Sequence, residues 1–309
     1  MQPAPYFKPD RGQFLLDKPD VIFAGNRCAR RPRPGLDGPF PDGPCLLTAR
    51  MLSYQHHYHA GNAADVHKHA VLAWMLDYLT RKDKSLSYIE THAGRGLYDL
   101  GDAAAIRTGE ATLGVGRLAQ RFPADHPYRR CVEAVRARHG YAAYPGSPLV
   151  AALDLRVSDT IHLAELHPGE HAHLRATMAP FAAHVRKQDG FEMAHSLCPP
   201  TPRRGLMLVD PSYEVKADYD ALPRHLARIA RAWNVGILML WYPILMSERH
   251  GDMLRALQAA FPDALRHEVG FAGPREGRGM IGSGLFVVNP PFGLADEAAR
   301  ISSLFTAKH

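Results

Sequence analysis

The stretch from Leu86 to Gly96, which reads LSYIETHAGRG, decides the fold. Its first part, Leu86–Thr91, has the short apolar pattern of a buried strand. That strand runs directly into a Gly-x-Gly pair formed by Gly94 and Gly96. Glycines at the carboxyl end of a strand allow a tight turn and a close approach of the backbone to a ligand. The stretch is typical of the nucleotide-binding turn of a doubly wound fold, although a plain strand-to-loop turn would look the same.

Further strands and helices alternate on both sides of this stretch. A helix is predicted over residues 62–82, with Asn62 as its N-cap, Asp65 in its first turn and Arg81 and Lys82 in its last. Further strands are expected at residues 161–166, 184–187, 206–209, 236–241 and 285–289. Strands that alternate with helices predict an α/β fold whose mostly parallel, twisted sheet carries helices on both faces.

Two segments do not fit this alternation. About 70 residues separate the first two strands, more than one crossover helix needs. Residues 103–122 and 124–139 have helical patterns, so we expect a small helical subdomain inserted at about 100–143. Residues 1–50 contain 9 of the 25 prolines and show no period. We expect them to be a disordered or dispensable extension, and residues 51–309 to form the functional domain.

Composition excludes several classes of protein. The chain has 309 residues, 46% hydrophobic and 22% charged, as in an average globular protein. Its longest apolar run, Val235–Met246, has 12 residues, whereas a membrane-spanning helix needs ~20. The four cysteines are scattered, which argues against a disulfide framework and suits a cytoplasmic protein. The net charge of +6 is only a weak sign of a nucleic-acid partner, because residues 1–50 contribute half of it, with 8 Lys and Arg against 5 Asp and Glu.

Acidic residues follow the next two strands. Glu165 ends the strand at residues 161–166, where a carboxylate can accept hydrogen bonds from both ribose hydroxyls of an adenosine-containing cofactor. Asp189 and Gly190 follow the strand at residues 184–187, and Asp189 could accept a hydrogen bond from an adenine amino group. A solvated loop carboxylate and a plain turn are the structural alternatives.

The most specific motif is Asp210-Pro-Ser-Tyr213, directly after a strand. It resembles the Asp-Pro-Pro-Tyr motif of amino-methyltransferases that use S-adenosylmethionine. An exocyclic adenine amine is a poor nucleophile, and a carboxylate and the Pro211 carbonyl can accept its two N–H bonds, while Tyr213 stacks on the extruded base. Ser212 replaces the second proline, which leaves the loop less pre-organised. The alternative is a strand that ends at an ordinary Asp-Pro turn.

Two other groups of residues could suggest a metal site and a second catalytic motif. The histidines at positions 56, 57, 59, 67 and 69 cluster in the sequence, but their spacing matches no zinc motif, and we expect no metal. The sequence Asn289-Pro-Pro-Phe292 matches the amino-methyltransferase pattern better than Asp210 does. It lies too close to the chain end to be followed by the remaining strands, so we interpret it as the end of the last strand.

The order of these motifs is that of a Rossmann-like class I methyltransferase. Residues 51–62, MLSYQHHYHAGN, resemble the opening of the RlmJ family, bacterial 23S ribosomal RNA adenine-N6 methyltransferases. The segments DVHKH, ETHAGRGLYDL, RTGE, YPGSPL, LAELHP, QDGF, LVDPSYE, LWYP and GSGLFVVNPPF resemble the same family in the same order. The resemblance covers residues 51–309 and not residues 1–50.

This resemblance implies a role for particular residues. Asp210 would be the catalytic carboxylate, and Tyr54 would contact the RNA, with Pro211 and Tyr213 also on the substrate side. The S-adenosylmethionine site would be lined by His69, His92, Ser147, Glu165, Asp189 and Gly190. Tyr54, His69 and Ser147 are supported by the resemblance alone.

We therefore expect a cytoplasmic, monomeric enzyme that transfers a methyl group from S-adenosylmethionine to N6 of an adenine in 23S rRNA before ribosome assembly is complete. No membrane and no metal would be involved. A DNA adenine-N6 methyltransferase and a catalytically inactive RNA-binding homologue are the alternatives. Comparing RNA with DNA oligonucleotides would distinguish the first, and cofactor binding without turnover would indicate the second.

Overall fold

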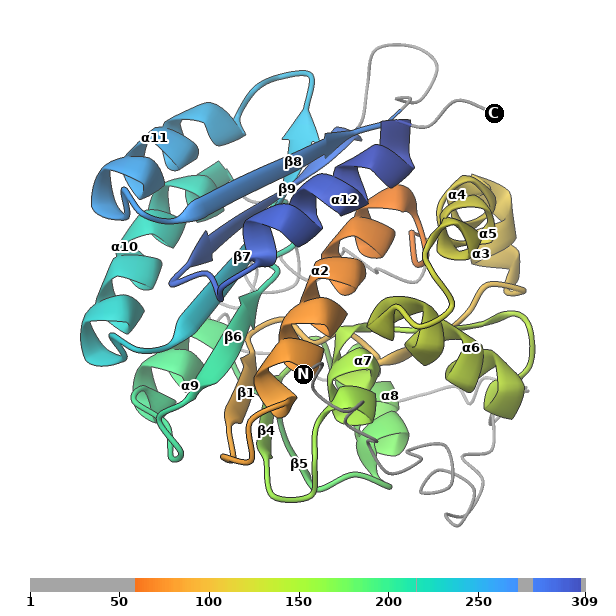
Figure 1. The fold of residues 1–309 in the computed structure, drawn as a ribbon, viewed down its shortest axis with the longest axis horizontal. Helices are drawn as coiled ribbons and strands as arrows, with labels where there is room; N and C mark the ends of the chain where they lie inside the picture. The colour runs from red at the N-terminus through yellow and green to blue at the C-terminus, as the bar shows by residue number, and fades with distance from the viewer. Residues whose placement is uncertain (1–58, 215, 272–279, 307–309) are drawn as a thin grey trace, which may run out of the picture. The chain divides into compact units, whose positions relative to one another are not determined.

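The computed structural model describes residues 59–214, 216–271 and 280–306. Its centre is a seven-stranded sheet in the order β5-β4-β1-β6-β7-β9-β8 (Figure 1). The strands are β1 (Ser87–Glu90), β4 (Thr160–Ala164), β5 (Ala183–Arg186), β6 (Gly205–Val209), β7 (Ile237–Leu245), β8 (Leu265–Gly270) and β9 (Met280–Val288). The first five strands in that order pair in parallel, whereas β9 is antiparallel to both β7 and β8. This is the class I methyltransferase arrangement, and the predicted fold class is confirmed.

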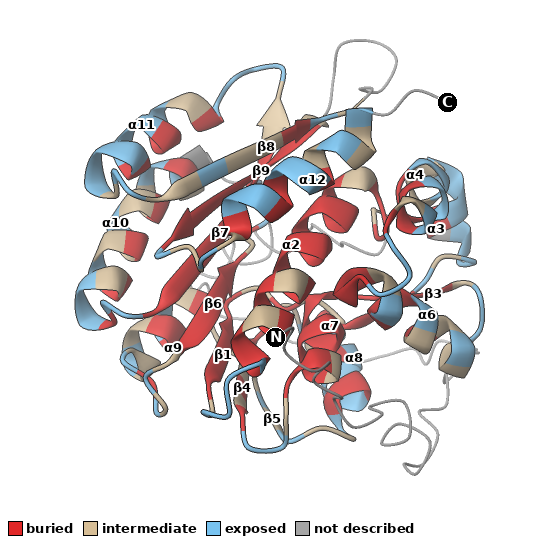
Figure 2. Ribbon diagram, in the orientation of Figure 1, coloured by how far each residue is buried: buried red, intermediate tan, exposed pale blue. Residues whose placement is uncertain are grey.

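Helices cover both faces of the sheet (Figure 1). One face carries α2 (Ala63–Thr80), α7 (Ser147–Asp154), α8 (Pro168–Met178) and α12 (Leu294–Thr306). The other carries α9 (Gly190–Leu197), α10 (Lys216–Ala232) and α11 (His250–Ala260). Each face has its own apolar core, and the central strands β1, β6, β7 and β9 are buried along most of their length, whereas the edge strands β5 and β8 are only partly buried (Figure 2).

Helix α2 begins as the sequence predicts. The side chain of Asn62 accepts a hydrogen bond from the backbone N–H of Asp65 and so caps the first turn. Fifteen of the 18 residues of α2 are buried, including its charged residues. The helix therefore lies inside the protein rather than on its surface, and its polar side chains must find partners within the fold.

Several short elements lie between β1 and α7. Their order is β2 (Leu97–Asp99), α3 (Ala103–Thr108), α4 (Glu110–Leu113), α5 (Val115–Leu118), η2 (Ala119–Arg121), α6 (Pro127–His139) and β3 (Ala143–Pro145). Strands β2 and β3 pair with each other in an antiparallel manner. The helical pattern over residues 103–122 is interrupted at Gly109, which has φ +64°, and at Gly114, whose Cβ would lie 2.1 Å from the Gly61 carbonyl oxygen. The left-handed φ at Gly109 favours glycine and the close packing at Gly114 requires it, and the segment forms three short α-helices instead of one.

The predicted strands at residues 86–91, 161–166, 184–187, 206–209, 236–241 and 285–289 are confirmed, with ends shifted by a few residues. Strand β8 was not predicted. Residues 1–50, expected to form an extension, lie outside the described residues. Among the described residues, none of the helices combines the length and apolar character that crossing a membrane requires.

Candidate functional site

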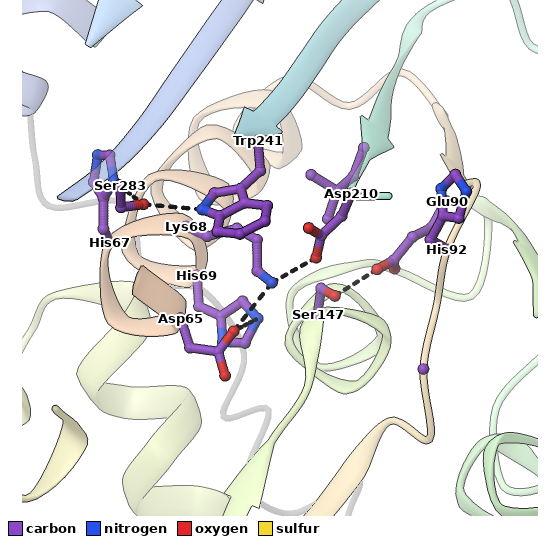
Figure 3. Close-up of polar contacts among 12 residues, drawn as sticks. Asp65, His67, Lys68, His69, Glu90, His92, Ser147, Asp210, Trp241 and Ser283 are labelled. Carbon is purple, nitrogen blue, oxygen red and sulfur yellow. Dashed lines mark hydrogen bonds and ion pairs between the residues drawn. The ribbon is translucent and has the colours of Figure 1, made fainter. Parts of the chain in front are cut away.

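The carboxyl ends of β1, β4, β5 and β6 lie side by side, because these strands are parallel neighbours. Asp210 directly follows β6, the strand next to β1. Its Oδ2 accepts a hydrogen bond of 2.6 Å from Nζ of Lys68, a residue of α2 that is 142 positions away in the sequence (Figure 3). The motif at Asp210 predicts a functional carboxylate, but nothing in the sequence points to Lys68 as its partner.

Lys68 joins two carboxylates. Its Nζ also lies 3.0 Å from Oδ1 of Asp65, one turn earlier on α2. The other oxygen of Asp65 accepts the backbone N–H of Gly61 at 2.9 Å. Burial opposes the charge on Lys68, but the carboxylates of Asp210 and Asp65 outweigh it and raise the pKa of Lys68 above its ordinary value. Lys68 therefore remains a cation and holds the Asp210 carboxylate in one orientation.

Glu165 lies at the end of β4, as predicted, next to the glycine turn after β1. One of its carboxylate oxygens accepts the backbone N–H of Gly94 at 2.8 Å, and the other accepts that of His167 at 2.7 Å. Gly94 has φ +62°, a conformation that favours glycine. Burial raises the pKa of Glu165, while these two hydrogen bonds act in the opposite direction. The structure thus joins two of the predicted features, the glycine turn and the acid at the next strand.

Asp189 caps α9 at the end of the following strand, β5. Its Oδ1 accepts the backbone N–H groups of Phe191 and Glu192, both at 2.9 Å. Gly190 packs so closely against the turn after β1 that a Cβ would lie 1.9 Å from the Thr91 carbonyl oxygen. Glycine at position 190 therefore allows the segment after β5 to pack against the turn after β1. This is a structural reason for the glycine, in addition to the predicted contact with a cofactor.

His92 lies in the turn after β1. Its Nδ1 is 2.8 Å from the Thr91 hydroxyl, and its ring meets the Phe191 ring edge-on, with 5.5 Å between centroids. Burial lowers the pKa of His92, although Asp210 and Asp189 raise it. His92 is therefore a neutral imidazole at pH 7, placed between the ends of β1, β5 and β6.

Ser147 contacts the buried carboxyl group of Glu90, a residue that no motif in the sequence pointed to. Its hydroxyl donates to Oε1 of Glu90, the last residue of β1 (Figure 3), and the Tyr88 hydroxyl donates to Oε2 at 2.8 Å. Glu90 has no exposed surface. Burial raises its pKa to about 8, with a smaller contribution from the nearby Asp210, while hydrogen bonds from Ser147 and Tyr88 oppose the shift. Glu90 is thus protonated at neutral pH, close to the Lys68–Asp210 pair.

His69 is also buried in this region. Its Nδ1 lies 2.9 Å from the Tyr144 hydroxyl, and the two rings stack with 5.7 Å between centroids. Its Nε2 is 4.0 Å from Oδ1 of Asp65, the carboxylate that also contacts Lys68. His69 therefore lies near Asp65, the other carboxylate that contacts Lys68, and 1% of its surface is exposed.

The loop after Asp210 does not present Tyr213 as an open aromatic face for a base, which is what the motif predicts. Pro211 is buried and Ser212 is exposed. The Tyr213 ring is 9% exposed and packs against Tyr219 and Trp241. Its hydroxyl donates to the Trp241 carbonyl oxygen at 2.6 Å, and its φ is +57°, which is rare for an aromatic residue. In this conformation Tyr213 braces the loop, and only a small part of its ring is open to a base.

Tyr54 lies outside the described residues, as do His56 and His57. The three other histidines of the sequence cluster point to different partners, because His59 contacts Glu110, His67 contacts Ser283, and His69 contacts Tyr144. Within residues 59–214, 216–271 and 280–306, no group of three or more His, Cys, Asp or Glu side chains could hold a metal ion.

Asn289 lies away from Asp210. It directly follows β9, as predicted, and its side chain donates to the carbonyl oxygens of Asn234 and Gly236 at the start of β7. Val288 is level with Leu238 on β7, whereas Val209, before Asp210, is level with Leu240. Because β9 runs antiparallel to the parallel strands, Asn289 lies at their amino-terminal ends, whereas Asp210 lies at a carboxyl end.

The site fits an adenosine-containing cofactor in two respects. The turn after β1 is a cradle of backbone that side chains at Gly94 and Gly190 would disturb, because a Cβ would lie 2.5 Å from the Tyr98 hydroxyl at the first and would collide with Thr91 at the second. Carboxylates at the ends of β4 and β5 border this turn. Carboxylates placed in this way match ribose hydroxyls and an amino group, both of which donate hydrogen bonds.

Comparisons with known proteins agree on one family. The family model described as "Ribosomal RNA large subunit methyltransferase D, RlmJ" matches residues 83–308. The chain is 40% identical to the Ribosomal RNA large subunit methyltransferase J of Escherichia coli, over 81% of this chain and 91% of that protein. It is 35% identical to the protein of the same name from Haemophilus influenzae, over 83% and 93%. A crystal structure of a Legionella pneumophila protein has 33% identity and a TM-score of 0.73, covering 80% of this chain and 94% of that one.

Proposed function

The chain belongs to the RlmJ family of ribosomal RNA large subunit methyltransferases, and we propose that it methylates N6 of an adenine in 23S rRNA with S-adenosylmethionine as methyl donor. The observation that carries the proposal is the Asp210 carboxylate at the end of β6, oriented by a buried lysine. S-adenosylmethionine would supply an electrophilic methyl group on a sulfonium, the RNA would supply the adenine amine, and the chain must activate that amine.

Asp210 and Pro211 prepare the amine for attack. The N6 lone pair of adenine is delocalised into the ring, and acceptors for both N–H bonds favour a pyramidal nitrogen whose lone pair is localised. Lys68 engages Oδ2 of Asp210, and we assign Oδ1 and the Pro211 carbonyl oxygen to the two N–H bonds. Methyl transfer would form the N–C bond as the sulfonium S–C bond breaks, its electron pair returning to sulfur to leave the thioether S-adenosylhomocysteine, and the nitrogen would then lose one proton to Asp210 or water. Because the Lys68 cation stabilises the charged carboxylate, Asp210 acts chiefly as a hydrogen-bond acceptor.

The remaining residues of the site would hold the cofactor. Glu165 would accept the ribose hydroxyls, and Asp189 would accept the adenine amino group through Oδ2, since its Oδ1 already caps α9. His92, Ser147 and His69 would border the same site, and Gly190 would line it through its backbone. Tyr54 would contact the RNA, together with Pro211 and Tyr213.

We place this activity on free 23S rRNA in the cytoplasm, before ribosome assembly is complete, with the protein acting as a monomer. Methylation needs one adenine out of its stack inside the active site, and an unassembled RNA allows this at lower cost. Residues 51–309 would suffice for the reaction, and residues 1–50 would be dispensable.

The decisive experiment offers the protein 23S rRNA from cells that lack the modification, with labelled S-adenosylmethionine. Label in N6-methyladenine at one position is the expected result, and a DNA oligonucleotide of the same sequence should accept far less. Faster transfer to DNA would instead indicate a DNA methyltransferase. Cofactor binding without turnover on either nucleic acid would indicate a catalytically inactive binding protein.

A further inference from the structure

A row of hydrogen bonds leads from the active site to the C-terminal helix. The indole N–H of Trp241 on β7 donates to Oγ of Ser283 on β9 at 2.9 Å. This hydroxyl lies 2.8 Å from Nδ1 of His67 on α2 (Figure 3). His67 Nε2 is 2.9 Å from Nδ1 of His267 on β8, and His267 Nε2 is 2.7 Å from Oγ of Ser302 on α12. We call Ser283, His67, His267 and Ser302 the polar chain.

The chemistry of the indole sets the direction of these bonds. An indole N–H can only donate, so the Ser283 oxygen accepts from it and its own proton can go to Nδ1 of His67. His67 then carries its proton on Nε2 and donates to His267, which donates in turn to Ser302. Both imidazoles are neutral in this arrangement. Burial lowers the pKa of His67 and of His267, which supports the neutral forms.

Trp241, at the start of this row, contacts Lys68, the partner of Asp210, and Tyr213, in the loop that follows Asp210. Lys68 Nζ lies 5.4 Å from the centroid of the indole, and the Tyr213 hydroxyl donates to the Trp241 carbonyl oxygen at 2.6 Å. The Lys68 ammonium therefore bonds the Asp210 carboxylate and lies beside the Trp241 indole (Figure 3). A rotation of the indole would remove one wall of the space that holds Lys68.

We propose that Ser283, His67 and His267 are positioning residues for methyl transfer, because the polar chain fixes the Trp241 indole and thereby the Lys68–Asp210 pair. This inference rests on the proposed function. Ser283 and His67 have no exposed surface, and they reach the reaction only through Trp241 and α2. The role matters because small displacements of a catalytic group lower the rate more than they lower stability.

The test uses substitutions that break the polar chain at chosen bonds in the full-length protein. Ser283→Ala removes the acceptor of the indole N–H. His267→Gln places an amide near the position of Nε2 and loses the contact with His67, whereas His267→Asn places one near Nδ1 and keeps it. His126→Asn is a matched control, because it breaks a buried bond of 3.1 Å to Glu297 on the same helix α12. That bond belongs to no part of the polar chain.

Single-turnover methylation of 23S rRNA should be about tenfold or more slower for Ser283→Ala and His267→Gln. The affinity for S-adenosylmethionine should change less than twofold. His267→Asn should recover most of the rate, and His126→Asn should keep it. The ¹⁵N-labelled indole resonance of Trp241, one of three tryptophans, should shift in the two slow variants and not in the control.

Two results would overturn the inference while leaving the proposed function intact. One is a Ser283→Ala variant that methylates 23S rRNA as fast as an active wild-type protein does. The other is a loss of rate that follows the melting temperature equally in all variants, the control included, which would reduce the polar chain to a structural role. Failure of the wild type to methylate any RNA would refute the proposed function itself.

Discussion

Replacing Glu90 with glutamine should stabilise the protein at alkaline pH, by an amount that grows as the pH rises. Burial raises the pKa of Glu90 from its ordinary 4.5 to about 8 in the folded protein. At 1.36 kcal/mol per pKa unit, the interval between those values corresponds to roughly 5 kcal/mol. Glutamine has nearly the same shape and can donate to the hydroxyl of Ser147 or Tyr88, but it never has to be ionised inside the protein.

The sign follows from proton binding. The folded protein binds the Glu90 proton more tightly than the unfolded chain does, so folding is favoured most below pH 4.5 and this advantage is lost as the pH rises to about 8. Glu90→Gln has no such loss. Its free energy of unfolding should therefore gain on that of the wild type by about 1.4 kcal/mol per pH unit across this window. At pH 9 the melting temperatures should differ by roughly 10–20 °C.

Circular dichroism of thermal unfolding at pH 5, 6, 7, 8 and 9 measures this difference, because groups common to both proteins cancel. Glu297→Gln is the control with the opposite sign. Burial opposes the charge of Glu297, but hydrogen bonds from His126 and Arg300 lower its pKa below the ordinary value. That carboxylate stabilises the fold at pH 8, so its glutamine variant should be less stable than wild type there. Parallel stability curves for Glu90→Gln and wild type would refute the reasoning.

Four further results are expected. Asp210→Ala should slow single-turnover methylation about 10²–10³-fold while the protein still binds S-adenosylmethionine, whereas Asn289→Ala should affect stability at most; a dead Asn289→Ala with an active Asp210→Ala would reverse the assignment. Lys68→Met should cost about 3–5 kcal/mol of stability in chemical denaturation, because it leaves the buried Asp65 carboxylate and the partly buried Asp210 carboxylate without their cation, and a neutral effect would contradict the contacts described. Gly190→Ala should destabilise by about 1–3 kcal/mol or more and weaken cofactor binding in calorimetry, since its Cβ would collide with backbone; a fully stable variant would argue against that close packing. Tyr54→Ala should weaken RNA binding by roughly 1–3 kcal/mol with cofactor affinity unchanged, and equal losses in both would point to misfolding instead.

Local patterns predicted the sheet and its motifs well. The strand and Gly-x-Gly turn at Leu86–Gly96, the Asn62 cap and the acids at the ends of β4, β5 and β6 all depend on residues close together in the chain. Side-chain period, capping and turn chemistry act over a few residues, so the sequence displays them directly. Strand β8 was missed because half of its residues, LRHEVG, are polar and the strand is only partly buried, so the apolar run that reveals a strand is weak there.

The fold class, the family and the order in which functional residues follow the strands could all be predicted from the amino-acid sequence. Which side chains meet at the strand ends became visible with the folded chain. The Lys68–Asp210 bond joins residues 142 positions apart, and the Ser147–Glu90 bond joins residues 57 positions apart. Nothing in the sequence around Glu90 indicates a pKa of about 8, because the shift comes from burial by elements distant in the chain. In the same way Tyr213, whose motif predicts an aromatic face for a base, is found bracing its loop through the Trp241 carbonyl. Contacts of this kind arise from the packing of helices against the sheet, which a local pattern does not encode.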